Sequence, residues 1–442
     1  MADPPWQTCQ FHRSLYREHR NGPPRQRALP WVQTPILINA PMSGAATSDL
    51  AVAVSRAGGL GQIGFLDSKR SLAGQLERAK HELHDIMNAQ KDIPEPVLPV
   101  GVGMIVFGSP VAHWLSLFSK YKPAVVWLSF ATTAEFKVWA EGIRKASPYT
   151  QVWIQVGSVS AAVEAAQACR PDALVLQGSD AGGHGHALGA SVISLLPEVA
   201  DVLRDRGLDD VSLIAAGGIV DGRGVSAAIM LGAAGVVMGT RFLGAEETKL
   251  PRQFREAVFD ASDGGQATVR SRVFDEMWGP SPWPEVYDGR CLRNSSYEYV
   301  KRGMSMSDMR LQLHRDLQGT QGQQLDFKET VTVWAGTGVG MVKKSDRAAD
   351  IVEQVQCEAR RRLQDRPLVA AARPLKSMEA PAVSLRGSRV FMRRQASVQR
   401  MAHKSAIMRM AHGNPILGAA NSIIMGNITP PSPPAVQAMP VA

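Results

Sequence analysis

The sequence predicts an α/β protein: a (β/α)8 (TIM) barrel with a mainly helical cap segment and a disordered C-terminal tail. Two observations favour the barrel. Short apolar runs bounded by turn residues alternate with segments of helical period, as is typical of parallel strands joined by helices. Eight such units fit within about 210 residues, which is the compact end of the range for this fold.

Each predicted strand is an apolar run that ends at turn residues. The eight runs are 35–41, 59–65, 97–107, 124–130, 151–157, 173–178, 212–216 and 235–239. The segments between them have the spacing of apolar residues that predicts amphipathic helices. These helices are expected over 48–58, 71–86, 109–121, 132–146, 158–169, 191–207 and 222–232.

The 442-residue chain is longer than the barrel requires. We predict an N-terminal leader over 1–34, the barrel over 35–262, a cap over 263–365 that completes the barrel mouth, and a basic, proline-containing tail over 366–442. The net charge of +9 resides in the tail, because residues 380–442 contain seven Arg or Lys and no acid, which leaves 9 − 7 = +2 elsewhere. We therefore expect no nucleic-acid partner and interpret the tail as disordered, with a basic amphipathic helix over 389–411 as the alternative.

Cysteine usage and the chain ends bear on location. The four cysteines, Cys9, Cys169, Cys291 and Cys357, are far apart and form no CxxC pair, which indicates free thiols in a reduced intracellular setting. No run of about 18 apolar residues predicts a membrane span. Five Arg before residue 30 resemble a transit peptide, but a solvated leader is favoured, so we expect a cytoplasmic protein.

Residues 212–248 predict a phosphate site. Gly217 and Gly218 follow the seventh strand, and Gly239 and Thr240 follow the eighth. Glycines allow backbone N–H groups to approach an anion closely, and the N-terminus of the next helix adds a favourable dipole. The loops after strands seven and eight are the usual phosphate site of this barrel.

The segment QGSDAGGHGH, residues 177–186, follows the sixth strand and carries the candidate catalytic residue, His184. An imidazole suits general acid/base chemistry, and strand ends of this barrel face the active-site mouth. Gly182 and Gly183 would let the backbone pass close to a flat ligand. His184 and His186 have no third ligand at a recognised spacing, so no metal site is predicted.

Other strand ends carry groups that suit a flavin ring. Ala40 and Met42 follow the first strand, where backbone groups can meet the polar edge of the ring and the Met42 thioether can form an apolar wall. Gln62 at the second strand and Gln177 at the sixth carry amides that could bond ring nitrogen and oxygen atoms.

Three stretches together resemble the nitronate monooxygenase family, formerly called 2-nitropropane dioxygenases. They are PILINAPMSGAATSDLAVAVSRAGGLGQIG, QGSDAGGHGH and AAGGIVDGRGVSAAIMLGAAGVVMGTRF, and they span about residues 35–248. The later loop WAGTGVG, residues 334–340, is also similar. The resemblance implies a barrel that binds flavin mononucleotide (FMN), with its phosphate at Gly217, Gly218, Gly239 and Thr240 and His184 as base or orienting residue. Asp180 departs from the glutamate common in the family.

The activity implied by the resemblance is oxidation of a small-molecule alkyl nitronate by O2 to a carbonyl compound and nitrite, with nitroalkanes as further substrates. Two alternatives remain open. One is a flavin-dependent NAD(P)H reductase of an enone, quinone or enoyl thioester, as in the related enoyl-acyl carrier protein reductases. The other is a non-catalytic flavin-binding protein. The oligomeric state is left open by the sequence.

Overall fold

The computed structural model describes residues 29–91, 95–318 and 331–364. The predicted tail, its alternative amphipathic helix and most of the leader lie outside these residues. Within them, no helix combines the length and the apolar character needed to cross a membrane.

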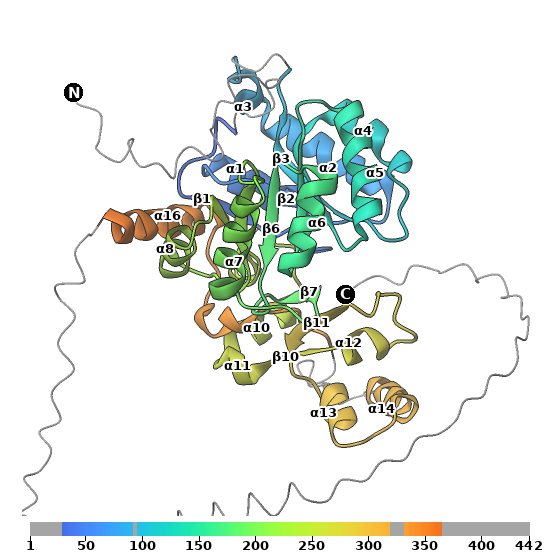
Figure 1. Ribbon diagram of the computed structural model, residues 1–442. Coiled ribbons are helices and arrows are strands. Elements are labelled where there is room, and N and C mark those ends of the chain that lie inside the picture. The colour runs from blue at the N-terminus through green and yellow to red at the C-terminus, as the bar shows by residue number, and fades with distance from the viewer. Residues whose placement is uncertain (1–28, 92–94, 319–330, 365–442) are drawn as a thin grey trace, which may run out of the picture. The chain divides into compact units, whose positions relative to one another are not determined.

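Eight parallel strands form the barrel, and all eight predicted strands are confirmed (Figure 1). Each strand pairs in parallel with the next around the barrel, in the order β1, β9, β8, β6, β5, β4, β3, β2. The two ends of this series meet through a parallel bridge between Ile38 and Leu60, so the sheet closes on itself. The strands are β1 (Ile36–Asn39), β2 (Gly61–Ile63), β3 (Leu98–Ile105), β4 (Pro123–Ser129), β5 (Gln151–Val156), β6 (Ala173–Gln177), β8 (Ser212–Ala216) and β9 (Gly235–Met238).

Alternate residues of each strand build two separate cores. Val125 and Trp127 of β4 point into the barrel, where Trp127 packs near Trp153, whereas Val126 and Leu128 point outward to the helices. This alternation is the period of two of a β-strand. The bulky interior side chains fill the barrel as a packed core, so a ligand is expected only at its mouth.

The predicted helices surround the sheet with small changes at their ends. Helix α2 stops at Glu82 and a separate turn, α3, follows, and the helix predicted from residue 109 begins as a 3-10 turn after Pro110. The helices are α1 (Ser48–Arg56), α2 (Lys69–Glu82), α3 (His84–Asn88), α4 (Leu115–Tyr121), α5 (Thr133–Ala146), α6 (Val159–Cys169), α7 (Val192–Asp205) and α8 (Gly222–Met230).

The eighth helix of the barrel shell comes from far along the chain. Helix α16 (Ala348–Gln364) lies beside α8 and also packs against α1, at the seam between β9 and β1 (Figure 1). The sequence predicts this segment as part of the cap at the barrel mouth. Its buried face, which includes Ile351, Val352 and Val355, instead joins the outer core of the barrel.

The buried side chain of Gln356 ties α16 to the start of the barrel. Its amide nitrogen donates to the carbonyl oxygens of Gln33, Pro35 and Gly58 at 3.2, 3.1 and 3.5 Å. We expect Gln356→Met to lower the free energy of unfolding by about 1–3 kcal/mol, because the carbonyls of Gln33 and Pro35 lose this donor, whereas that of Gly58 still accepts from the Gln33 N–H. Urea denaturation of the apoprotein measures this. Gln354→Met, the same change at an exposed position of α16, should have little effect, and equal losses in the two variants would contradict the tether.

A second, smaller sheet lies at the barrel mouth. Strand β7 (Gly183–His186) pairs antiparallel with β11 (Tyr287–Leu292), which pairs with β10 (Thr268–Ser271). These three strands were not predicted, because GHGH has no apolar alternation and its partner is about a hundred residues away. The remaining elements around this sheet are α9 (Thr240–Leu243), α10 (Arg252–Asp260), α11 (Gly264–Ala267), α12 (Val273–Glu276), α13 (Ser295–Lys301), α14 (Met306–Gln318) and the 3-10 turn η4 (Thr337–Met341).

Candidate active site

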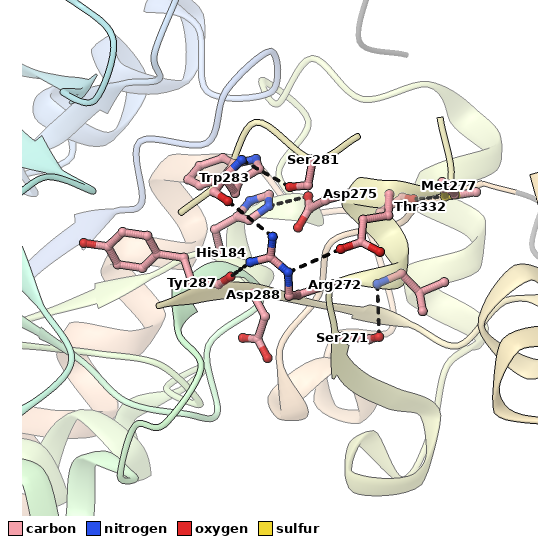
Figure 2. Close-up of polar contacts among 12 residues, drawn as sticks. His184, Ser271, Arg272, Asp275, Met277, Ser281, Trp283, Tyr287, Asp288 and Thr332 are labelled. Atoms are coloured by element: carbon pink, nitrogen blue, oxygen red, sulfur yellow. Dashed lines mark hydrogen bonds and ion pairs between the residues drawn. The ribbon is translucent and has the colours of Figure 1, made fainter. Parts of the chain in front are cut away.

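His184 lies on β7, opposite Gly289 of β11, and its ring is mostly buried. Its Nε2 atom is 2.6 Å from Oδ1 of Asp275, on helix α12 of the cap (Figure 2). The side chains of His184 and Asp275 are 13% and 5% exposed. With Nε2 engaged at the carboxylate, Nδ1 is the ring atom that remains to accept a proton.

Aromatic rings enclose His184, and we call this set the aromatic wall. The Trp283 ring stacks on the imidazole with centroids 3.7 Å apart and an interplanar angle of 10°, and the Trp334 centroid is 4.7 Å away. Gly289 permits this arrangement, because a Cβ there would lie 2.3 Å from the Trp334 ring. The wall consists of Phe107, Phe130, Trp283, Tyr287 and Trp334.

Phe130 joins the wall from the end of β4 in a strained conformation. Its φ of +60° lies in the left-handed region, which costs about 1–3 kcal/mol for a non-glycine residue. Its ring contacts Trp283, Tyr287 and His184 edge to face. The packing of these rings offsets the strain and keeps the barrel strand in contact with the cap.

Arg272 holds the turn that carries Trp283. Its guanidinium donates to the carbonyl oxygens of Trp283 and Tyr287 at 3.3 and 3.1 Å (Figure 2). It also donates to the Pro284 carbonyl oxygen at 3.3 Å. The turn-rich block around GPSPWPEVYDGR therefore has a fixed shape over His184. Since Arg272 precedes α12 directly, the same segment places both Trp283 and Asp275.

Gln177 supports the backbone of His184. Its Nε2 donates to the His184 carbonyl oxygen at 2.9 Å, and its Oε1 accepts from Gln155 at 3.0 Å. Both halves of the amide thus already bond within the protein. Two residues beyond His184, burial lowers the pKa of His186, whose ring packs against Tyr287, so His186 is neutral near pH 7.

The glycines after β8 and β9 lie side by side, because the two strands pair directly. Gly217 and Gly218 have φ of +110° and +73°, a region that favours glycine. The backbone N–H groups of Gly217, Gly218 and Gly239 donate no hydrogen bond to any other described residue. Such free donors fit the oxygens of a phosphate.

Helix α8 does not offer its N-terminus to this site, which differs from our expectation. The Asp221 side chain caps the helix by accepting from the N–H groups of Arg223 and Gly224 at 2.9 and 3.2 Å. The Gly222 N–H donates to Glu358 of α16 at 3.0 Å. An anion would therefore meet the loop glycines and the segment that starts at Thr240.

Ala40 and Met42 lie beside Gly239, since a Cβ added there would be 3.4 Å from the Ala40 Cβ and 4.0 Å from the Met42 sulfur. Gln62 is fully buried on β2, and neither atom of its amide has a hydrogen-bond partner among the described residues. Burying an amide without partners costs free energy. This donor and acceptor pair fits the polar edge of a flavin ring.

The WAGTGVG loop closes over these strand ends. The Gly336 N–H donates to the Thr240 hydroxyl at 2.9 Å, and the Thr337 N–H donates to the Asp180 carbonyl at 3.0 Å. Gly182 is needed for this contact, because a Cβ there would lie 2.4 Å from the Ala335 backbone. Gly183, at φ +73°, has open space where a Cβ would be. The structure thus places these two predicted glycines differently: Gly182 against the loop and Gly183 beside His184.

Asp275 and the aromatic wall were not predicted from the sequence. Both come from segments 50 to 150 residues away from His184, and no local pattern connects them. The one available signal was the density of aromatic residues in PWPEVYDG and the tryptophan of WAGTGVG.

The chain is similar to known proteins in sequence and in fold. The sequence model of the family described as "Nitronate monooxygenase" matches residues 28–272. Nitronate monooxygenase npaC of Metarhizium robertsii is 40% identical over 339 residues, which cover 76% of this chain and 93% of that protein. A nitronate monooxygenase of Neurospora crassa is 36% identical over 355 residues, covering 76% and 92%. The solved structure of FabK from Thermotoga maritima has a TM-score of 0.56 and 25% identity over 74% of this chain and 93% of its own.

These relatives define the class of the protein as a flavin-dependent oxidoreductase. The closed barrel, the free amides at its strand ends and the enclosed histidine fit that class. The chain belongs to the nitronate monooxygenase family.

Proposed function

We propose that the protein uses bound FMN and O2 to oxidise alkyl nitronates to carbonyl compounds and nitrite, and that it also accepts neutral nitroalkanes. The observation that carries the proposal is the position of His184, held by Asp275 and enclosed by the aromatic wall at the mouth of the barrel. The relatives named nitronate monooxygenases support the same reaction.

The residues present fit FMN. The backbone of Gly217, Gly218 and Gly239 and the hydroxyl of Thr240 would bind its phosphate. Thr240 accepts a hydrogen bond from Gly336 and can still donate its own O–H. When bound, the flavin supplies the electron-transfer chemistry that links the nitronate to O2. The ring would be contacted by groups from three strand ends, namely Ala40, Met42, Gln62 and Gln177, with Gly182 and Gly183 in the loop beside it.

The protein residues handle the proton and the substrate. A neutral nitroalkane must lose a proton from the carbon next to the nitro group, and Nδ1 of His184 is available to accept it. The aromatic wall excludes water and offers an apolar surface to the alkyl chain. A preformed nitronate needs no proton removal, so it would use His184 only for orientation.

Anaerobic titration of the purified protein tests the reaction. We expect a preformed alkyl nitronate to bleach the flavin absorbance, and expect nitrite and a carbonyl product once O2 is admitted. Bleaching by NAD(P)H but not by nitronate would replace this proposal with the reductase alternative. Bleaching by neither would indicate a non-catalytic flavin-binding protein.

The identity of the flavin is tested separately. Heat denaturation should release FMN, because the phosphate site lies at the barrel mouth and no covalent attachment is proposed. Release of FAD, or protein free of flavin after expression with ample riboflavin, would contradict this part of the proposal.

A further inference from the structure

We propose that Asp275 is the positioning residue of His184: its carboxylate accepts the Nε2 proton and thereby directs the lone pair of Nδ1 to the substrate. The inference rests on the proposed function for the identity of the substrate. Asp275 lies in the cap, outside all of the sequence motifs at the strand ends.

The first observation is the geometry of the pair. The distance of 2.6 Å from Nε2 to Oδ1 is that of a short, charge-assisted hydrogen bond. Oδ2 of Asp275 is buried and has no partner among the described residues. His184 is thus the group that the carboxylate holds, which distinguishes Asp275 from a residue that builds a structural ion-pair network.

The second observation is that nearby charged groups are engaged elsewhere. Arg272, at the start of α12, contacts Glu276 and the carbonyls of the 283–287 turn. Arg270 pairs with Asp288 on the opposite face of the small sheet from His184. Burial, together with the charge of Asp275, raises the pKa of the Cys291 thiol well above its usual value, so Cys291 stays protonated.

The third observation is that a second contact fixes the same ring. Trp283 stacks on the imidazole face at 3.7 Å, while Asp275 bonds its edge (Figure 2). The face contact sets the plane of the ring, and the edge contact sets its rotation and its tautomer. A catalytic imidazole requires both, because a base must point its lone pair at the proton that it removes.

The proton transfer balances with these groups alone. The C–H bond next to the nitro group breaks, its electron pair remains with the substrate as the nitronate, and the proton goes to Nδ1. The resulting imidazolium lies against the Asp275 carboxylate, which stabilises the new charge without taking the proton. A buried aspartate has this role beside the histidine of hydrolase triads.

Kinetics of Asp275→Asn test the role. The Asn amide would donate to Nε2 and place the ring proton on Nδ1, so we expect kcat/KM for a neutral nitroalkane to fall about 10²–10⁴-fold, mostly through kcat. Oxidation of the preformed nitronate should fall much less. Asp275→Glu should restore part of the loss. The matched control is Asp308→Asn, the same change at an exposed acid of α14 that accepts from Ser305, which should leave both rates near those of the unchanged protein.

A spectroscopic test reads the tautomer of His184 directly in the unchanged protein. The His184 signals in the ¹⁵N NMR spectrum are those that disappear in His184→Asn. In the unchanged protein these signals should show a neutral ring with its proton on Nε2. A proton on Nδ1 would overturn the proposal, as would equal losses of Asp275→Asn on nitroalkane and nitronate. If the protein oxidises no nitronate but the tautomer changes in Asp275→Asn, the proposed function fails while the positioning by Asp275 stands.

Discussion

Replacing His184 by Asn should lower kcat/KM for a neutral nitroalkane by about 10²–10⁴-fold, the usual contribution of a positioned general base. The expectation follows from the site geometry. Asp275 and Trp283 hold the ring in one orientation, and Nδ1 is its remaining basic atom. Asn approximates the size of the ring edge but cannot accept a proton at neutral pH. Steady-state kinetics on flavin-replete protein measure the loss.

The role of His184 is decided by comparing how much activity His184→Asn loses on the nitroalkane and on the preformed nitronate. Oxidation of the preformed nitronate omits proton removal, so the variant should retain much more of that activity. Equal losses on nitroalkane and nitronate would reject the base and leave an anion-binding or orienting residue. Full activity on both substrates would remove His184 from the active site. Flavin occupancy should be unchanged, since the proposed phosphate site lies at the ends of β8 and β9.

Replacing Gly239 by Val should weaken flavin binding by about 10–100-fold, the equivalent of losing hydrogen bonds to a charged group worth about 1.5–3 kcal/mol. Gly239 suits this test better than Gly217 or Gly218. Its φ is −94°, which other residues adopt, and the nearest atom to an added Cβ is 3.4 Å away. A side chain at this position points toward Ala40 and Met42, next to the Gly239 N–H, so it narrows the proposed flavin site without requiring a positive φ.

The control for this prediction is Gly74→Val, the same change in helix α2 where an added Cβ meets nothing within 4 Å. We expect the control to bind flavin normally. Titration of each apoprotein with FMN gives the dissociation constants, and thermal unfolding of the apoproteins shows whether the fold is retained. Unchanged FMN affinity in a folded Gly239→Val protein would place the phosphate elsewhere.

The eight barrel strands and the residues at their ends were predictable from the sequence. A parallel strand buried on both faces is a continuous apolar run, and its partner is the next run along the chain, so local patterns suffice. The strand-end glycines were equally visible, because a turn that needs positive φ selects glycine at Gly217 and Gly218. By itself the sequence thus determined the barrel, its mouth and the candidate histidine.

The tertiary structure alone decided what surrounds that histidine. Strand β7 forms only because β11 supplies its hydrogen-bond partner, and Asp275 meets His184 across 91 residues of chain. The position of helix α16 could not be predicted from the sequence either. Its apolar face could pack in a cap or against the barrel, and only the structure shows that it packs between α1 and α8. Periodicity reports which face of an element is buried, but it does not report what covers that face. Contacts between distant segments depend on how the whole chain packs, and the contact between Asp275 and His184 is one of them.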